Sequence, residues 1–338
     1  MSKLTCKEKE EFIKEYDIRE QFIQAEIVDS NLWDNLQAIG ESYDEYSKNS
    51  DAIAQGLLVE ILKSDELKKI HSVRYRIKDK NSLKVKIVKK KSALINDVSK
   101  DYEVEKYREL NSDNYYKILT DLIGFRILIR YRPQWETVHK WIWSNFYQGD
   151  EHYINNHLND YESHVDKPFI AEKPKVYYRN KTDLSFYEQM GRNFFEFIES
   201  DEGYNSIHYI INKDGKYIEI QVRTIFDEAW SECTHDIVYK NKDKSLRREL
   251  NSLSKCLSQQ TIAAESIVNL LYDKVFNTDD SHGTIDAFMN ISGLPKNNND
   301  NMSNDAKTVA PKISNIKRRI QKINDTESEF DGDVGKLI

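Results

Sequence analysis

Residues 206–223, with the sequence SIHYIINKDGKYIEIQVR, decide the fold class of this chain. Two apolar runs, 206–212 and 217–223, are separated by a segment that contains Asp214-Gly215. Asp-Gly between apolar runs is typical of a tight hairpin turn, so we expect two adjacent antiparallel strands. Apolar and polar residues alternate in the second strand, which puts one set in the core and the other on a charged face. The apolar set is Ile218, Ile220 and Val222, and the polar set is Tyr217, Glu219, Gln221 and Arg223.

The segments around this hairpin predict helices and one more strand. Residues 122–131 (LIGFRILIRY) are short and rich in β-branched side chains, which is typical of a central strand. Apolar residues recur at helical spacing through Trp135–Ile142, in the acidic residues 1–70 and from Ser245 to Phe276. Residues 145–200 show no clean period, and no element is assigned there. The sequence therefore predicts an α+β fold with a helical N-terminal segment and a C-terminal helical extension.

Composition limits the class of protein. The 338 residues are 39% hydrophobic and carry a net charge of −7, so a buried core is expected and an anion-binding surface must come from local basic clusters. The three cysteines lie far apart without metal-ligand spacing, which is typical of reduced thiols. The sequence contains no signal-peptide core and no apolar run long enough to span a bilayer. We expect a soluble, cytoplasmic protein with no membrane partner.

A basic tract, residues 68–91, holds eleven Lys or Arg side chains against a single acid. Arg76 and Lys78 are two residues apart in an extended lead-in, so they share a side. If a helix begins near residues 81–82, Ser82 and Lys86 lie one turn apart and share a face. These cations and this hydroxyl could converge on a polyanion such as a nucleoside triphosphate. Taken alone, the tract is more typical of a Lys-rich surface helix.

Two acids lie on or beside the predicted strands. Asp121 directly precedes the strand at 122–131, and Glu219 lies on the polar face of the second hairpin strand. A buried carboxylate without a partner is costly, so each acid needs one. A shared Mg²⁺ would supply it and would bind phosphate oxygens as well. The alternative is that each acid pairs with a nearby arginine, such as Arg126 or Arg223.

The chain lacks both GxxxxGK[ST] and GxGxxG, so phosphates must be bound by side chains. The hexapeptide GYNSIH, residues 203–208, offers groups for a nucleotide. Gly203 allows close backbone approach, Tyr204 offers a plane for stacking on a base, and His208 offers a ring donor. The alternative is an aromatic strand with a histidine that is satisfied internally.

Together these pieces resemble the synthetase domain of the RelA/SpoT alarmone family over roughly residues 60–240. The resemblance rests on five motifs in the family's order: Arg76-Lys78-Ser82-Lys86, Asp121-Gly124-Arg126, Gly203-Tyr204-Ser206-His208, Glu219-Gln221-Arg223-Thr224 and Trp230…His235…Tyr239-Lys240. It implies a nucleotidyltransferase-like mixed β-sheet flanked by helices. We expect a helical segment at 1–60, a synthetase domain at 61–276, and at 277–338 a polar linker and short basic amphipathic helix with an acidic tail, partly disordered. No His-Asp metal motif occurs in residues 1–70, so no hydrolase domain is expected ahead of the synthetase.

The resemblance also implies an activity, the transfer of pyrophosphate from ATP to the ribose 3′-hydroxyl of GDP or GTP. The product would be (p)ppGpp, and AMP would leave. By the same resemblance, Arg76 and Arg126 would sandwich the adenine of ATP. The phosphates of ATP would be held by Lys78, Ser82 and Lys86.

The acids and the hexapeptide receive roles from the resemblance too. Asp121 and Glu219 would bind Mg²⁺, and Glu219 could also take the proton of the attacking hydroxyl. Tyr204 would stack on the acceptor base. The other acceptor-binding residues would be His208, Gln221, Arg223 and His235.

Two further functions stay open. A branch of the same family consists of toxins that pyrophosphorylate the 3′ end of tRNA, with an antitoxin protein as partner. Lys173, Lys175, Arg179 and Lys181 surround Tyr177 and Tyr178, a basic-aromatic cluster of the kind that binds single-stranded RNA. In addition, Glu202 stands where many alarmone synthetases carry Asn beside the acceptor base. The third function is a catalytically inactive nucleotide-binding module. An oligomer is compatible with all three.

Overall fold

The computed structural model describes residues 3–95, 105–147, 168–179, 184, 195–200, 203–234, 237 and 244–276. The chain divides into two compact units, Met1–Thr261 and Ile262–Ile338. The sheet and every candidate site residue belong to the first unit. The described part of the second unit is the end of helix α10 (Lys244–Phe276). The predicted linker, basic helix and acidic tail at 277–338 lie outside the described residues.

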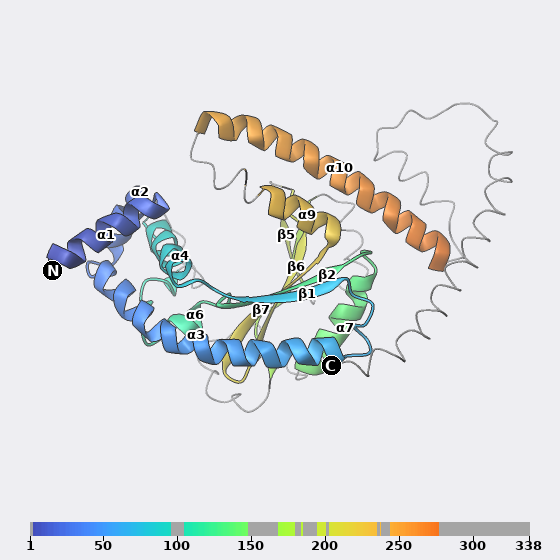
Figure 1. Cartoon of the computed structure of the whole chain (residues 1–338), viewed down its shortest axis with the longest axis horizontal. Coiled ribbons are helices and arrows are strands. Elements are labelled where there is room, and N and C mark those ends of the chain that lie inside the picture. Colours follow the sequence, from blue (N-terminus) through green and yellow to red (C-terminus); the bar gives the residue numbers. More distant parts are fainter. Residues whose placement is uncertain are drawn as a thin grey trace, which may run out of the picture. The chain divides into compact units, whose positions relative to one another are not determined.

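Among the described residues, seven strands form one mixed sheet (Figure 1). They are β1 (Ser72–Ile77), β2 (Ile123–Ile129), β3 (Phe169–Ile170), β4 (Lys175–Tyr178), β5 (Glu196–Glu199), β6 (Ser206–Lys213) and β7 (Lys216–Thr224). The strand order is β1-β2-β7-β6-β4-β5, and β3 pairs with β6. β2 runs parallel to β7 and β4 to β5, whereas the other pairs are antiparallel. The predicted α+β fold with a mixed sheet is confirmed.

The predicted hairpin is the pair β6 and β7, joined at Asp214-Gly215. Both turn residues have positive φ, 52° at Asp214 and 72° at Gly215. Two consecutive residues with positive φ match the right-handed twist of the flanking strands, and Asp-Gly adopts that conformation at low cost. The strands pair in register from Ile207 opposite Val222 to the turn.

Helices cover both faces of this sheet (Figure 1). One face packs on the C-terminal half of α3 (Leu32–Lys63) and on α7 (Gln134–Phe146), while α9 (Ile225–Thr234) lies over the other. Leu57 of α3, Phe125 of β2 and Ile220 of β7 are all fully buried in the first core. Each such side chain stabilises the fold by roughly 1.5–3 kcal/mol. The apolar set predicted from β7 therefore faces the core, and its polar set projects from the opposite face, where Arg223 contacts α9.

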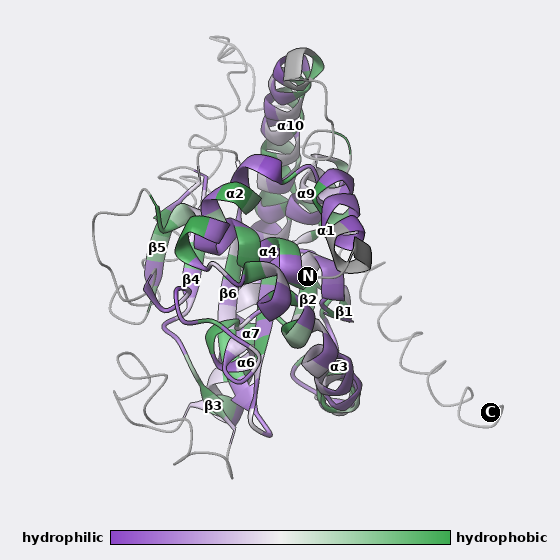
Figure 2. Cartoon of the chain, turned by 90° about the vertical axis from the view of Figure 1, so that its left-hand side faces the viewer, coloured by the Kyte–Doolittle hydropathy of each residue, from purple (hydrophilic) through white to green (hydrophobic). Residues whose placement is uncertain are grey.

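A second core joins the helical N-terminal segment to the basic tract. It contains apolar side chains of α1 (Lys3–Tyr16), α2 (Arg19–Val28), the first half of α3, α4 (Lys80–Ala93) and α6 (Tyr115–Ile118). Figure 2 shows α2 and α4 side by side, each with hydrophobic and hydrophilic faces. Leu83, Ile87 and Val88 of α4 are buried here, so the helical part of the basic tract is packed against this core. The domain boundary at residue 60 stays a prediction, and α3 runs across it to Lys63.

The turn from β1 into α4 positions the first cations of the tract. Asp79 is the N-cap of α4, and its carboxylate accepts a hydrogen bond of 2.8 Å from the amide of Ser82. The backbone of Lys78 is held from both sides, because its amide donates to Leu122 and its carbonyl accepts from the hydroxyl of Tyr43. The predicted helix start near residues 81–82 is confirmed at Lys80.

Two segments differ from the simple sequence pattern. Strands β3, β4 and β5 lie within residues 145–200, where the sequence shows no period because each strand has only two to four residues. Helix α10 is confirmed, but Leu246, Leu253 and Leu257 on it are exposed to solvent. The exposed fraction of Leu253 is 65%. No helix in the described ranges is both long and apolar enough to cross a membrane.

Candidate functional site

The polar face of the sheet gathers the predicted site residues. Paired residues of neighbouring strands project from the same face. The register sets Arg76 of β1 opposite Gly124 of β2, and Gly124 beside Glu219 of β7. It also sets Arg126 beside Gln221. Three strands that lie far apart in the sequence thus bring two arginines, an acid and an amide to one surface.

A pocket of about 300 Å³ opens on this face. It is lined by Arg74, Tyr75, Arg76, Gly124, Phe125, Arg126, Glu219, Gln221 and Glu232. The Arg76 side chain lies over Gly124, where an added Cβ would be in ordinary van der Waals contact at 3.6 Å from its Nε. The two arginines predicted to sandwich adenine therefore line one pocket together with Glu219. The volume is at the lower end of the range for small-molecule sites.

Asp121 is bound by two lysines of the basic tract. Nζ of Lys78 lies 2.9 Å from Oδ2, and Nζ of Lys86 lies 2.7 Å from Oδ1. Burial alone would raise the pKa of Asp121, but the two ammonium groups outweigh it and lower the pKa to about 2. Pairing of this acid with Arg126 or Arg223, the sequence alternative, is wrong. The lysines predicted to hold phosphate instead converge on the predicted metal acid.

Glu219 has partners from β6 and β7. Its Oε1 lies 3.1 Å from Nδ1 of His208, and its Oε2 accepts a hydrogen bond of 2.8 Å from the amide of Gln221. Burial raises the pKa of Glu219, but the contact with His208 outweighs it, so the pKa is lowered overall. The charge of Asp121 acts in the opposite direction and raises this pKa. The charge of Asp121 therefore reaches Glu219.

The donor set of these two acids fits Mg²⁺. This ion is held in proteins by one or two carboxylates, together with substrate phosphates and water. Oδ1 of Asp121 is buried and has only the ion pair with Lys86, without hydrogen-bond geometry. Within the described ranges no three His, Cys, Asp or Glu side chains cluster as a complete metal site. Phosphate oxygens would therefore have to complete the coordination.

Ser82, the remaining residue of the predicted phosphate group, lies in the first turn of α4. It is exposed, and Lys86 lies one turn further along the same helix. The predicted one-turn spacing of these two residues is confirmed. Their contact with phosphate stays a prediction.

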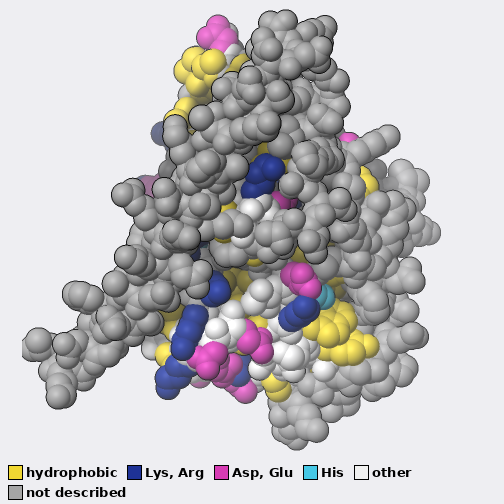
Figure 3. All heavy atoms as spheres, turned by 90° about the vertical axis from the view of Figure 1, so that its right-hand side faces the viewer, with side chains coloured by type: hydrophobic (Ala, Val, Ile, Leu, Met, Phe, Trp, Pro, Cys, Tyr) yellow, Lys and Arg dark blue, Asp and Glu magenta, His cyan; other side chains and the backbone are white. Residues whose placement is uncertain are grey.

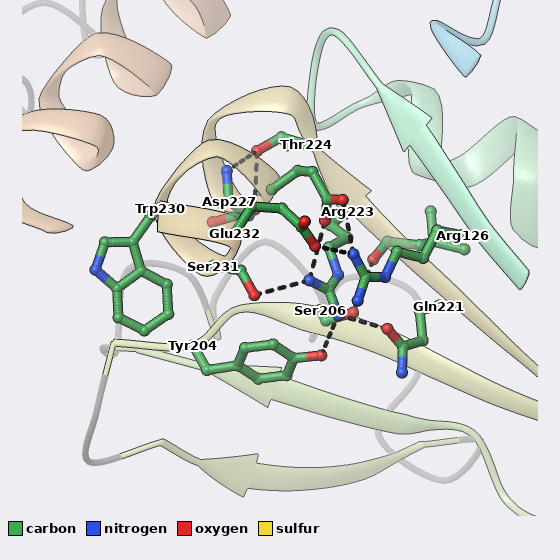
Figure 4. A network of polar contacts seen from close by, with 12 residues as sticks. Arg126, Tyr204, Ser206, Gln221, Arg223, Thr224, Asp227, Trp230, Ser231 and Glu232 are labelled. Carbon is green, nitrogen blue, oxygen red and sulfur yellow. Dashed lines mark hydrogen bonds and ion pairs between the residues drawn. The ribbon is translucent and has the colours of Figure 1, made fainter. Parts of the chain in front are cut away.

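A second acid, Glu228 of α9, gathers three arginines. Nη1 of Arg126 lies 2.9 Å from its Oε1, and Nη1 of Arg223 lies 3.1 Å from its Oε2. Arg74 also contacts Oε1. Glu232, one turn further along α9, contacts Arg74 and Arg126 as well. Figure 4 shows Arg126, Arg223 and Glu232 converging between the sheet and α9.

The sequence prediction omits Glu228 and Glu232. Their four-residue spacing in α9, directly after β7, puts both on one helical face, and that spacing is the signal available in the sequence. The arginine partners come from β1, β2 and β7, and only the fold brings them there.

Those predicted acceptor residues that the structure describes form one polar network. The hydroxyl of Tyr204 lies 2.9 Å from Nε2 of His208 and accepts a hydrogen bond of 2.6 Å from Arg223. The guanidinium carbon of Arg223 also lies 5.0 Å from the centroid of the Tyr204 ring. Gln221 accepts from Arg223 and donates to Glu219, which closes the network. Arg223 itself is buried, with a side chain only 3% exposed.

Gly203 directly precedes Tyr204 of this network and has a backbone conformation that favours glycine. Its φ is 84°, and an added Cβ would lie 2.7 Å from the hydroxyl of Ser258 in α10. The close backbone approach expected at Gly203 is thus made to a helix of the same unit. His235, Glu202, Lys181 and Tyr239-Lys240 lie outside the described residues.

Comparison with known families agrees with these motifs. The model described as "Region found in RelA / SpoT proteins" matches residues 75–244, about half of the chain. The chain belongs to the RelA/SpoT family. No curated protein matches it.

Solved structures include similar chains. A GTP pyrophosphokinase family protein from Streptococcus pneumoniae is 13% identical, with a TM-score of 0.40 and coverage of 72% of this chain and 96% of the other. The small alarmone synthetase 1 of Bacillus subtilis is 15% identical, with a TM-score of 0.37 and coverage of 69% and 99%. The same synthetase bound to AMPCPP is 12% identical, with a TM-score of 0.38 and coverage of 70% and 100%. Similarity at this level says nothing about the substrates of this chain.

Proposed function

We propose that this chain is an ATP-dependent pyrophosphokinase that transfers the β,γ-pyrophosphate of ATP to the ribose 3′-hydroxyl of GDP or GTP. Membership of the RelA/SpoT family supports a (p)ppGpp-synthetase-like function. The observation that carries the proposal is the polar face of the sheet. There a pocket lined by Arg76, Arg126 and Glu219 accompanies an acid, Asp121, that two lysines flank and whose charge reaches Glu219.

The residues suit a reaction in which the charge to be stabilised is phosphate charge. Catalysis of phosphoryl transfer is mostly positioning and electrostatic stabilisation. The planar guanidinium groups of Arg76 and Arg126 would stack on adenine. Lys78 and Lys86 would exchange Asp121 for phosphate oxygens, since flexible ammonium side chains can change partners readily.

Asp121 and Glu219 would hold Mg²⁺, which supplies charge neutralisation at the phosphate oxygens when it is bound. Glu219 would accept the proton of the 3′-hydroxyl, and its hydrogen bond from Gln221 fixes the orientation of the carboxylate. The hydroxyl oxygen would form a bond to the β-phosphorus. The bond from that phosphorus to the oxygen bridging to the α-phosphorus would break, and AMP would leave.

The test is incubation of the purified chain with γ-labelled ATP, Mg²⁺ and either GDP, GTP or deacylated tRNA. We expect the label to move into the guanine nucleotide. Label in tRNA alone would show that tRNA, and not a guanine nucleotide, is the acceptor. If neither acceptor is labelled although ATP still binds, the result would support the inactive nucleotide-binding module. Glu219→Gln is expected to abolish transfer while leaving the fold intact. Turnover close to wild type in that variant would remove Glu219 from the reaction.

One support for the RNA alternative is the basic-aromatic cluster around Tyr177, and two of its cations are paired within the chain. Arg179 forms a buried ion pair with Asp227 at 2.9 Å, and their side chains are 3% and 4% exposed. Lys175 pairs with Glu172 at 3.2 Å. On the face drawn in Figure 3, described basic side chains lie beside acidic ones. The guanine nucleotide is therefore the leading acceptor, and an antitoxin partner and an oligomer stay predictions.

A further inference from the structure

Strand β4 extends the polar face beyond the residues predicted from the sequence. It pairs antiparallel with β6, with Lys175 opposite His208 and Tyr177 opposite Ser206. Opposed residues project from the same face, so these two side chains join the face that carries Glu219. The intervening Val176 is fully buried on the other side. Lys175 and Tyr177 therefore have a position at the site that no motif of the family assigns to them.

Tyr177 is packed into the acceptor side of this face. Its ring centroid lies 4.7 Å from that of His208 and 5.6 Å from that of Tyr204, the latter in a T-shaped arrangement. Burial raises the pKa of Tyr177, and the nearby charge of Glu219 raises it too. The residue is half-buried, so part of it remains accessible.

Tyr204 is less suited than Tyr177 to be the only stacking plane. Its hydroxyl is committed to His208 and Arg223, and the Arg223 guanidinium lies over its ring. The edge-to-face contact with Tyr177 constrains it from another side. These contacts fix Tyr204 as a support within the network.

We propose that Tyr177 is a base platform for the acceptor nucleotide, with Lys175 placed to bind its 5′-phosphates. This inference rests on the proposed function and names the acceptor subsite of the same site. Two residues along a strand are separated by about 6.6 Å, which is comparable to the distance from a purine ring to a 5′-phosphate. Stacking on a tyrosine ring tolerates any base, so the ligand class is a nucleotide, supplied free or as an RNA 3′ end.

Lys175 carries the charge that this role needs. Burial alone would lower its pKa, but Glu172 and Glu196 outweigh it, so the pKa is raised and the ammonium stays charged. Its side chain is 33% exposed and pairs with Glu172. A phosphate could therefore reach it.

The test compares Tyr177→Leu with Tyr178→Leu in the full chain. Tyr178 is the matched control because alternation along β4 points it to the opposite face. Calorimetric titration with GDP, without ATP, measures acceptor binding directly, and turnover assays give KM for GDP and for ATP. For Tyr177→Leu we expect GDP binding about tenfold weaker and KM for GDP about tenfold higher. The KM for ATP should stay within twofold, and Tyr177→Phe and Tyr178→Leu should bind GDP as the wild type does.

The second pair is Lys175→Met with Lys173→Met as control. Lys175→Met should weaken GDP more than guanosine, because only GDP carries phosphates. Equal GDP affinity of the wild type and both Tyr177→Leu and Lys175→Met would overturn the inference, as would wild-type protein that binds neither GDP nor deacylated tRNA. If Tyr177→Leu does not fold, Lys175→Met decides alone. Wild-type protein that binds GDP through Tyr177 but transfers no pyrophosphate would refute the proposed function and leave the platform intact.

Discussion

Two carboxylates on the same side of the molecule are surrounded in different ways. In the Asp121 cluster, defined as Asp121, Lys78 and Lys86, two lysines meet one acid. In the Glu228 cluster, defined as Glu228, Arg74, Arg126 and Arg223, three arginines meet one acid. The acids are 18% and 9% exposed, so both are largely removed from water. The difference lies in the cations.

Because of this difference, we expect the Asp121 cluster to change its contacts and the Glu228 cluster to keep them. A lysine is a point charge on a flexible stem, whereas an arginine presents a rigid planar fork. Lys78 and Lys86 can leave Asp121 when phosphate and metal arrive. Arg223 is tied at once to Glu228, Ser231, Tyr204 and Gln221, and it can move only if the network breaks. We infer that the Asp121 cluster exchanges partners during the reaction and that the Glu228 cluster holds the geometry.

The largest effect is expected from Asp121→Asn, which keeps the shape of the side chain and removes its charge. Transfer should fall about thousandfold, because the metal loses a ligand. The dissociation constant of ATP should stay within threefold, since Lys78 and Lys86 remain. Turnover and equilibrium ATP binding measured on the same preparation test this. Transfer within tenfold of wild type would place Asp121 outside the exchanging cluster.

The next effect concerns stability. Glu228→Gln leaves the buried Arg223 without its counter-charge and should lower the free energy of unfolding by about 3 kcal/mol. Glu232→Gln is the matched control on the same helix face. Its side chain is 51% exposed, so its loss should cost less than about 1 kcal/mol. Urea denaturation compares the two, and equal losses would show that the Glu228 cluster is not the fixed part.

The third prediction concerns how the free energy of unfolding depends on pH. The pKa of Asp121 in the fold is about 2, below its usual value of 3.8. A depressed pKa stabilises the fold above the usual value, and the stabilisation is lost as the pH falls from about 4 towards 2. Wild-type protein should lose about 2 kcal/mol more unfolding free energy over this range than Asp121→Asn does. Parallel pH dependences would mean that the lysines do not stabilise the ionised carboxylate.

The smallest effect is on ATP binding. Lys86→Ala and Lys78→Ala should each weaken ATP about tenfold, because each removes one charged contact to phosphate. Lys89→Ala, an exposed lysine on the same helix, should leave ATP affinity unchanged. Titration with ATP in the presence of Mg²⁺ measures all three. Unchanged affinity in both of the first two variants would end the idea of partner exchange.

The sequence predicts the individual helices and strands of this fold well. It predicts poorly the contacts between elements that lie far apart in the chain. The hairpin is predictable because Asp214-Gly215 specifies its turn and Ile220 lies in an alternating run. Motifs make Asp121 and Glu219 predictable as candidate site residues, and their roles stay predictions. The lysine partners of Asp121 are missed, because tertiary pairing between β1, α4 and β2 decides them rather than spacing.

Two other omissions have physical causes. Strand β4 has only four residues and pairs with a strand about thirty residues later, so periodicity cannot reveal it. The arginines around Glu228 come from β1, β2 and β7, which are neighbours in the sheet but lie far apart in the chain. A spacing rule within one helix cannot reach such partners.

The contact between Gly203 and Ser258 bears on how short a working fragment can be. The family match ends at residue 244, yet Ser258 closes against the backbone of the GYNSIH segment, and the indole of Trp230 donates to the carbonyl of Ser254. The first half of α10 thus packs against the segment that carries the predicted acceptor-binding residues. A chain that ends at residue 244 would keep every motif but lose this packing, so a fragment made for activity assays should extend past residue 258.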